Sequence, residues 1–335
     1  MKGIQTLHAH TTASDGQMSH LEVLDCAQKY GASVVAFTDH DVLPDRKTLE
    51  ILDQNRNHPV KWIVGIEISS GLPKELGGEV FSGLHITGLF VDPTNKRLLE
   101  YSKKALKART KRMEKMLKNL QNLGFDISEK DCLTASGGEA VGRPHIIQAL
   151  KVKQKNLDMI EALRVKMSQE TDEKIKNKYE NMIQKGETQY PFVLFLSEDS
   201  YIPNIYVDYL YWEDMDSVVK LIREAGGLAF VAHYSTAKTK ISFEMMEEII
   251  KSKRIDGVEV VYGMRGYEYQ DWAEDMRWLS QKADQYKLLK SGGADIHTED
   301  QFKLFSQMSE FSQKTIDMAE KIIENSGVDT TWSSF

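Results

Sequence analysis

The chain has 335 residues, 41% of them hydrophobic, so it can bury a full core as one large domain with an elaboration or as two modest domains. No apolar run approaches the roughly 18 residues of a membrane span, and the first residues lack signal-peptide character, so we expect a cytoplasmic protein without membrane contact. The only cysteines, Cys26 and Cys132, lie far apart, which excludes a disulfide framework and a thiolate zinc site. Metal ligands would have to be nitrogen and oxygen atoms.

The formal net charge of −7 argues against stable binding of duplex DNA. One stretch differs from the rest, because residues 96–118 hold ten Lys or Arg residues against only Glu100 and Glu114. This stretch is either a solvated helix face or a contact surface for a polyanionic substrate.

Seven short segments rich in β-branched residues are predicted as strands, with helical patterns between several of them. The predicted strands are Ile4–His10, Ser33–Asp39, Lys61–Ile68, His85–Val91, Leu228–His233, Gly257–Tyr262 and Leu288–Ala294. Alternation of strands and helices is typical of a parallel α/β sheet or barrel. The economical expectation is an α/β fold with a closed or nearly closed barrel.

The region from about 98 to 206 breaks this alternation, because helical periodicity and charge dominate it. We predict that residues 1–97 and 207–335 form the barrel. Residues 98–206 are then an inserted, mainly helical subdomain that binds substrate.

Histidines and isolated acids fall at the ends of the predicted strands. Six of the seven strands supply a candidate ligand, and the candidates are His8, His10, Asp39, His40, Asp41, Glu67, His85, His233, Asp295 and His297. Side chains two apart on a strand share a face, so His8 and His10 can point at one ion. The carboxyl ends of barrel strands meet at one rim, where these residues would converge. Only His85 departs from this pattern of ligands at the carboxyl ends of strands, because it lies near the start of its predicted strand.

Imidazole and carboxylate ligands suit zinc, manganese or iron, and Glu67 can bridge two ions. Each histidine taken alone is more often a hydrogen-bonded core or surface residue. Independent placement of the whole set at successive strand ends is improbable, so the set predicts a metal centre.

Four motifs in chain order resemble those of the polymerase and histidinol phosphatase (PHP) superfamily. They are Leu7-His8-Ala9-His10-Thr11-Thr12-Ala13-Ser14-Asp15-Gly16, Thr38-Asp39-His40-Asp41, Gly65-Ile66-Glu67-Ile68 and Gly293-Ala294-Asp295-Ile296-His297. The resemblance implies a distorted seven-stranded barrel that holds two to three divalent ions of manganese, zinc or iron.

The resemblance also implies which residues bind each ion. One ion would take His8, His10, Glu67 and Asp295. A second would share Glu67 and add His85 and His233. The third would use Asp15, His40 and His297.

Within the predicted insertion, Gly142-Arg143-Pro144-His145 resembles a motif of nucleoside bisphosphate phosphatases and related exoribonucleases. A guanidinium can bind a phosphate through two parallel hydrogen bonds, and His145 can add a donor. The alternative is a surface turn made by Gly and Pro. A P-loop is excluded, because Arg143 and Pro144 stand where Lys and Ser or Thr are required.

Two features leave alternatives open. Glu259 would either line the site or be a buried partner of a backbone amide or basic group. Tyr201, Tyr206, Tyr209, Tyr211 and Trp212 would either stack a nucleobase or belong to a core.

The resulting prediction is a phosphoesterase in which a hydroxide held at Glu67 attacks phosphorus. His145, His233 or a water would protonate the leaving oxygen. The expected substrate is a nucleoside 3',5'-bisphosphate or the 5' end of a short oligonucleotide. The alternatives are a histidinol-phosphate-type phosphomonoesterase, an amidohydrolase-type metal hydrolase, and a non-catalytic protein with a decayed site.

Overall fold

The computed structural model describes residues 3–77, 83–137, 140–263, 266–328 and 333–335. The chain forms two compact units. Unit 1 comprises Met1–Ala105 and Trp212–Phe335, and unit 2 comprises Leu106–Tyr211. The segment 98–206 overlaps unit 2, and its role as a substrate-binding subdomain stays a prediction.

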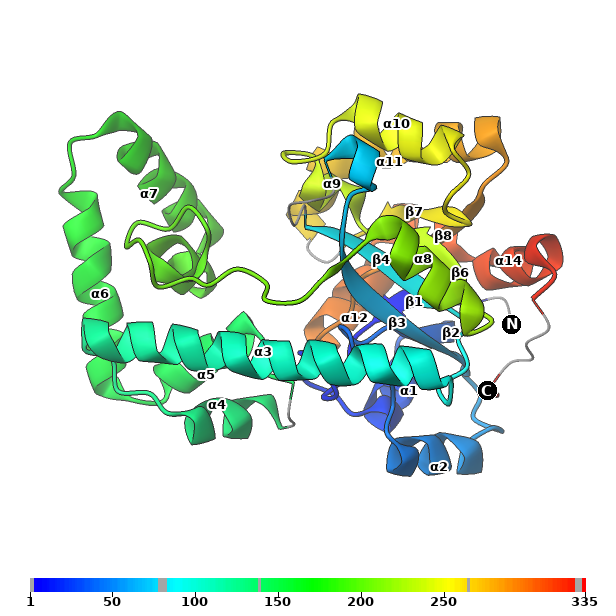
Figure 1. Ribbon diagram of the computed structural model, residues 1–335, viewed down its shortest axis with the longest axis horizontal. Helices are drawn as coiled ribbons and strands as arrows, with labels where there is room; N and C mark the ends of the chain where they lie inside the picture. The colour runs from blue at the N-terminus through cyan, green and yellow to red at the C-terminus, as the bar shows by residue number, and fades with distance from the viewer. Residues whose placement is uncertain (1–2, 78–82, 138–139, 264–265, 329–332) are drawn as a thin grey trace. The chain divides into compact units, whose positions relative to one another are not determined.

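Unit 1 is built around one twisted sheet that curls into a nearly closed barrel (Figure 1). Seven strands form its path in chain order: β1 (Ile4–Ala9), β2 (Ala32–Phe37), β3 (Lys61–Gly71), β4 (Leu84–Leu89), β6 (Leu228–Val231), β7 (Gly257–Tyr262) and β8 (Leu289–Gly293). The short strand β5 (Glu213–Asp214) pairs with β3 off this path. Each predicted strand therefore corresponds to a strand of the barrel, and the α/β barrel fold is confirmed.

The sheet is not wholly parallel. Strand β4 runs antiparallel to both β3 and β6, whereas the other neighbours on the path are parallel. The amino end of β4 therefore lies at the same rim as the carboxyl ends of its neighbours. This direction corrects the expectation of a parallel barrel and explains why His85 stands at a strand start.

The barrel closes where the carboxyl ends of β1 and β8 meet. Ala9 and Ile296 form a bridge, the amide of His10 donates to the carbonyl of Ile296 at 2.7 Å, and the amide of Ile296 donates to that of His8 at 3.2 Å. Gly293 permits this approach, because a Cβ atom there would lie 2.7 Å from the amide nitrogen of His8. Any larger residue would push the two strands apart.

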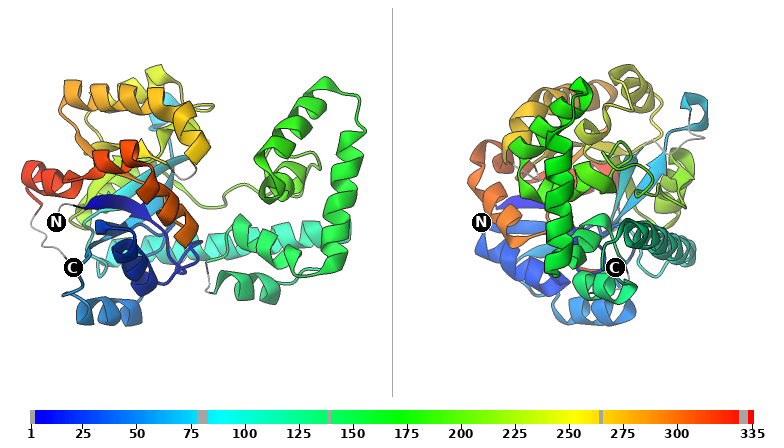
Figure 2. Two further views of the ribbon diagram at one scale, coloured as in Figure 1. Left: turned by 180° about the vertical axis from the view of Figure 1, so that it is seen from behind. Right: turned by 90° about the vertical axis from the view of Figure 1, so that its left-hand side faces the viewer.

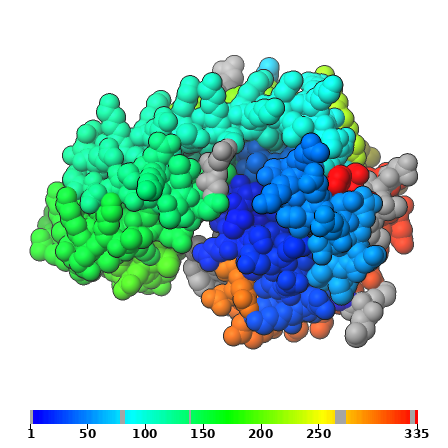
Figure 3. All heavy atoms as spheres, turned by 90° about the horizontal axis from the view of Figure 1, so that it is seen from below, coloured from blue at the N-terminus to red at the C-terminus, as the bar shows by residue number. Residues whose placement is uncertain are grey.

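Helices cover the outer face of the barrel (Figure 2). They are α1 (His20–Lys29), α2 (Arg46–Gln54), α8 (Met215–Glu224), α9 (Tyr234–Ala237), α10 (Phe243–Lys251), α11 (Gly266–Tyr286), α12 (Glu299–Gln307), α13 (Ser309–Ser312) and α14 (Met318–Ser326). Helix α1 begins at His20 because Ser19 and Glu22 form a capping box, and it buries Val23 and Leu24. Figure 3 shows the surface of this N-terminal part of unit 1 in blue.

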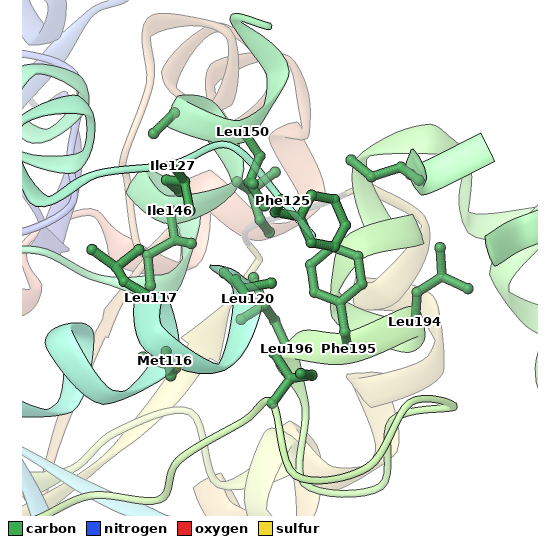
Figure 4. Close-up of a cluster of buried hydrophobic side chains, with 14 of the residues drawn as sticks. Met116, Leu117, Leu120, Phe125, Ile127, Ile146, Leu150, Leu194, Phe195 and Leu196 are labelled. Carbon is green, nitrogen blue, oxygen red and sulfur yellow. The ribbon is translucent and has the colours of Figure 1, made fainter. Parts of the chain in front are cut away.

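Unit 2 is helical. After α3 (Lys96–Leu123), which begins in unit 1, it contains α4 (Glu129–Ser136), α5 (Arg143–Lys151), α6 (Gln154–Ser168), α7 (Glu173–Lys185) and the π-helical turn Phe192–Leu196. Its apolar core gathers around the rings of Phe125 and Phe195, whose centroids lie 5.1 Å apart, with Leu120 and Leu150 beside them (Figure 4). Unit 2 thus has a core of its own. None of the helices in the described ranges is long and apolar enough to cross a membrane.

Candidate metal centre

The structure brings all nine predicted metal ligands of unit 1 to one rim of the barrel. His8 and His10 come from the end of β1, His40 follows β2, and Glu67 lies within β3. The remaining five are Asp15, His85, His233, Asp295 and His297. His40 and Glu67 form an isolated bridge between the end of β2 and β3, which brings the second motif against the third.

Glu67 lies at the centre of this cluster and is fully buried. Its Oε2 atom faces His8 at 3.2 Å, His10 at 3.2 Å and His40 at 2.9 Å. Its Oε1 atom faces His85 and His233, each at 2.7 Å. The two carboxylate oxygens therefore point at separate sets of imidazoles, which is the arrangement that a bridging carboxylate needs.

Three groups of donor atoms within this rim could each hold an ion, since the atoms of each group lie within 4.8 Å of one another. The groups are His8, His10, Glu67 and Asp295; His10, Asp15, His40 and His297; and His40, Glu67 and His85. His10 and His40 each occur in two groups, whereas the family resemblance assigned each of them to one ion.

Several potential ligand atoms of this cluster lie close together without hydrogen-bonding one another, as atoms that bind a common cation do. His8 Nε2, His10 Nε2, Asp15 Oδ1, Glu67 Oε2 and Asp295 Oδ1 are buried and make no hydrogen bond to any described residue. His10 Nε2 lies only 2.9 Å from Asp295 Oδ1, yet the geometry is not that of a hydrogen bond. Buried polar atoms without partners are costly, and ligation by a cation would satisfy them together.

The charges of the cluster depend on one another. Burial lowers the pKa of His8, but the carboxylates of Glu67, Asp295 and Glu259 outweigh it and raise this pKa well above its usual value. Burial raises the pKa of Glu67, but His40, His8 and His85 outweigh it and hold this pKa well below its usual value. Protons on the imidazoles balance the carboxylates, so we expect metal binding to release protons.

Four of the histidines have a second partner on Nδ1 that orients the ring. His8 Nδ1 lies 3.2 Å from Glu259, and His233 Nδ1 lies 3.0 Å from Thr236. The other two Nδ1 contacts join His10 to Ser14 and His297 to the carbonyl of Asp295. Because Nδ1 is engaged, Nε2 is the atom that each ring presents to the centre.

Glu259 joins two of these ligands. One oxygen contacts His8 Nδ1, and the other accepts a hydrogen bond from the backbone amide of His233 at 2.7 Å. Both alternatives from the sequence are therefore present, since Glu259 borders the site and is also the partner of a backbone amide. It orients two histidines rather than facing the centre itself.

Asp39 and Tyr262 support the site in roles that the sequence did not assign to them. Asp39 accepts hydrogen bonds from the amide and hydroxyl of Thr11 and from the hydroxyl of Ser14. Tyr262 donates to Asp295 at 3.3 Å. Asp39 lies inside the second motif and was visible as a strand-end acid, whereas no local pattern marks Tyr262 as a partner of Asp295.

The backbone is strained at three positions around the rim. Asp41, His233 and Asp295 have φ values of 57°, 27° and 52°, in the left-handed region that non-glycine residues rarely adopt. Such conformations persist only where the surroundings enforce them, and they gather at functional sites. The hydrogen bond from the backbone amide of His233 to the carboxylate of Glu259 is one such constraint.

The remaining predicted residues, Arg143 and His145, lie in unit 2 at the start of α5. Arg143 donates to the carbonyl of Leu196 at 3.1 Å, and its guanidinium lies over the rings of Phe192 and Tyr206. His145 is buried, and its Nδ1 accepts from the amide of Gly142 at 3.1 Å. Nδ1 is thus an acceptor, so a neutral His145 carries its proton on Nε2.

A barrel with imidazoles and carboxylates gathered at one rim has the architecture of a barrel metalloenzyme. The chain belongs to the PHP domain family, whose match extends over residues 6–328. The superfamily to which the motifs pointed is therefore confirmed.

Relatives with described activities cover most of the chain. A 5'-3' exoribonuclease of Haemophilus influenzae is 25% identical over 296 residues, which are 87% of this chain and 89% of the relative. A 3',5'-nucleoside bisphosphate phosphatase of Chromobacterium violaceum is 24% identical over 298 residues, which are 87% of this chain and 86% of the relative.

Solved structures share the fold. A protein described as a metal-dependent phosphoesterase of Bifidobacterium adolescentis superposes with a TM-score of 0.63 at 22% identity, covering 88% of this chain and 87% of that one. A protein described as an amidohydrolase of Chromobacterium violaceum superposes with a TM-score of 0.61 at 22% identity, with the same coverage. At this identity the likeness shows the fold alone.

Proposed function

We propose that this protein is a metal-dependent phosphoesterase that hydrolyses a phosphate ester of a nucleotide. The observation that carries the proposal is the position of Glu67, whose two oxygens face separate sets of imidazoles. Divalent ions of manganese, zinc or iron, two to three in number, would activate water and neutralise charge on the phosphoryl oxygens. Membership of the PHP family and the activities named for its relatives support this reading.

The chain's own residues divide the remaining work. His8, His10, Glu67 and Asp295 are buried and would hold the first ion rigidly. His40, His85, Asp15 and His297 keep 15 to 18% of their side chains exposed, so the rim opens to solvent on their side. A phosphate would enter there.

Protonation of the leaving oxygen is assigned to His145, His233 or a water, the three candidates from the sequence. His233 Nε2 lies 2.7 Å from Glu67, and Thr236 contacts its other ring nitrogen. His145 Nδ1 accepts from the Gly142 amide, so a proton delivered by this ring would come from Nε2. Substitution of each histidine by Gln, followed by the pH dependence of kcat, would show which group supplies the proton.

Arg143 is proposed to bind a second phosphate of the substrate. Its guanidinium makes no ion pair with a described carboxylate, so a phosphate would be its first anionic partner. The neighbouring Arg112 strengthens the local positive potential, because it is 5% exposed, lies over Tyr206 and Tyr209, and leaves Nη2 without a partner among the described residues. The two tyrosines offer rings for a base. A nucleotide with two phosphates matches these groups.

The test combines metal analysis of the purified protein with a phosphate-release screen. The substrates are adenosine 3',5'-bisphosphate, short RNA with a 5' phosphate, histidinol phosphate, and a panel of amides and lactones. We expect turnover of the bisphosphate or the RNA with manganese, zinc or iron. Turnover confined to histidinol phosphate would leave a phosphomonoesterase, and turnover confined to the amide and lactone panel would contradict the proposal. No turnover by a metal-loaded protein would favour a non-catalytic role.

A further inference from the structure

A cavity of unit 1 lies outside the metal centre, on the outer side of the barrel between α11 and α14. Its volume is about 890 Å³, which is in the range of small-molecule sites. Its lining comes from the strand pair β7 and β8, the two helices, the turn that joins α11 to β8, and the 3₁₀ turn Gln313–Thr315 before α14. The two helices are labelled beside β7 and β8 in Figure 1.

The floor of this cavity is apolar. Val260 and Leu289 contribute from the strands, Met276 from α11, and Met318 and Ile322 from α14. Outer strand faces of an α/β barrel are normally packed against helices, so their apolar side chains do not border open space. Here the two helices leave room above the floor, and an apolar or aromatic group would gain free energy by filling it.

The rim of the cavity is cationic in a protein of net charge −7. The charged residues that line it are Arg277, Lys287, Lys290, Lys314, Lys321 and Asp284. Asp284 is already paired with Lys290 at 2.6 Å. Lys287, Lys314 and Lys321 form no ion pair with a carboxylate in the described parts of the chain. The rim would therefore attract an anion.

The floor is connected to the metal centre through one strand. Pairing of β7 with β8 is irregular between Glu259 and Val261, which places Val260 in a bulge. Val260 lines the cavity, whereas Glu259 contacts His8 and the amide of His233. Bulges redirect side chains, and this one separates a cavity residue from the positioning carboxylate by one position.

We propose that this cavity is a regulatory site for a small amphipathic anion, with a phosphate or carboxylate head and an apolar or aromatic body. The head would lie among Lys314, Lys321 and Lys287, and the body would lie on the apolar floor. Binding shifts the bulge at Val260 and so changes how firmly Glu259 holds the metal-binding histidines. The coupling rests on the metal centre of the proposed function, but binding in the cavity does not.

The first experiment measures binding to the full-length protein with anilinonaphthalene sulfonate, an anion with an aromatic body, by fluorescence. We expect one saturable site. Charge reversal in a Lys314→Glu/Lys321→Glu variant should weaken it about tenfold, because two attractive charges become repulsive. The Gln281→Trp variant should also weaken it by filling the cavity. The control variant Lys47→Glu/Lys61→Glu reverses two exposed lysines that do not line the cavity and should bind as the wild type does.

Displacement of the probe then identifies the body of the ligand. Adenosine monophosphate and decanoate are added in turn. Displacement by adenosine monophosphate indicates a ligand with an aromatic body, and displacement by decanoate indicates one with an aliphatic body. Either result supports the site. Displacement by neither, or probe binding that both cavity variants leave unchanged, contradicts it. Melting temperatures of the variants confirm that they fold.

The second experiment tests coupling without relying on catalysis. The midpoint of Mn²⁺ binding is measured with and without saturating probe, in the wild type and in the Lys314→Glu/Lys321→Glu variant. A shift of this midpoint in the wild type alone supports regulation, since two coupled sites must affect each other reciprocally. An unchanged midpoint in the wild type overturns the regulatory role. Because phosphate release plays no part here, failure of the proposed catalytic activity would be seen separately.

Discussion

Both units of this protein bury apolar side chains, but unit 1 also buries a cluster of ionisable groups around Glu67. At the rim of the barrel, atoms such as His8 Nε2 and Glu67 Oε2 are buried and have no hydrogen-bond partner among the described residues. The core of unit 2 buries apolar side chains such as Phe125 and Phe195. An apolar core stabilises by itself, whereas a rim of imidazoles and carboxylates needs cations to compensate for desolvation. Metal should therefore add to the stability of unit 1 and leave that of unit 2 unchanged.

The largest effect is expected from Glu67→Gln. The substitution keeps the shape of the side chain but removes the charge that both sets of imidazoles face, so metal content should fall and phosphate release should drop to background. Metal analysis and the release assay check both outcomes, with Glu50→Gln, at an exposed position of α2, as the control. A Glu67→Gln protein that retains metal and turnover would remove the proposed role of this carboxylate.

The Phe195→Ala variant tests the apolar core of unit 2. Loss of this buried ring should destabilise unit 2 by about 3 to 5 kcal/mol, as is usual for large-to-small core substitutions. Denaturant unfolding measures the change, and Val165→Ala, at a partly exposed position of α6, provides the reference. Metal content should stay at the wild-type level. A parallel loss of metal would show that the two units do not respond separately.

A smaller effect is expected from Arg143→Ala. Hydrogen bonds to charged groups contribute about 1.5 to 3 kcal/mol, so kcat/KM for a bisphosphate should fall about ten- to a hundredfold. Turnover of a small chromogenic phosphate ester should change little, because that substrate lacks a second phosphate. Lys151→Ala, on the same helix, is the matched control. Equal losses on both substrates would refute the phosphate-binding role of Arg143.

An effect of similar size, on metal affinity instead of turnover, is expected from Glu259→Gln. Glutamine has one acceptor oxygen, so it can serve the His233 amide or His8 but not both. Mutation of a residue that hydrogen-bonds a metal-binding histidine typically lowers metal affinity about 10- to 100-fold. Titration with Mn²⁺ measures this, beside Glu310→Gln at an exposed position. Unchanged affinity would mean that the histidines hold their positions without this carboxylate.

Much of the barrel and its rim could be predicted from the sequence because the signals are local. Runs of β-branched residues marked the seven strands, and His8 and His10 at a two-residue spacing marked a shared face. The direction of β4 has no local signal, since strand pairing depends on distant neighbours. From the sequence, His85 was therefore expected at the opposite end of a parallel barrel from the other ligands. The antiparallel direction of β4 brings it to the same rim.

Other features depend on contacts between distant segments. Glu259 was seen as an acid on a strand, but its joint contact with His8 and His233 joins three separate strands. The cavity between α11 and α14 could not be predicted, because it depends on how closely two helices pack. The assignment of His10 and His40 to particular ions is likewise a matter of distances.

A crystal structure of the Mn²⁺-loaded protein with anomalous diffraction data would locate the ions relative to Glu67. We expect anomalous peaks on both sides of Glu67, one bound by Oε2 with His8, His10 and Asp295, and another by Oε1 with His85 and His233. Peaks that avoid Glu67, or none at this rim from a protein soaked in excess Mn²⁺, would contradict this expectation.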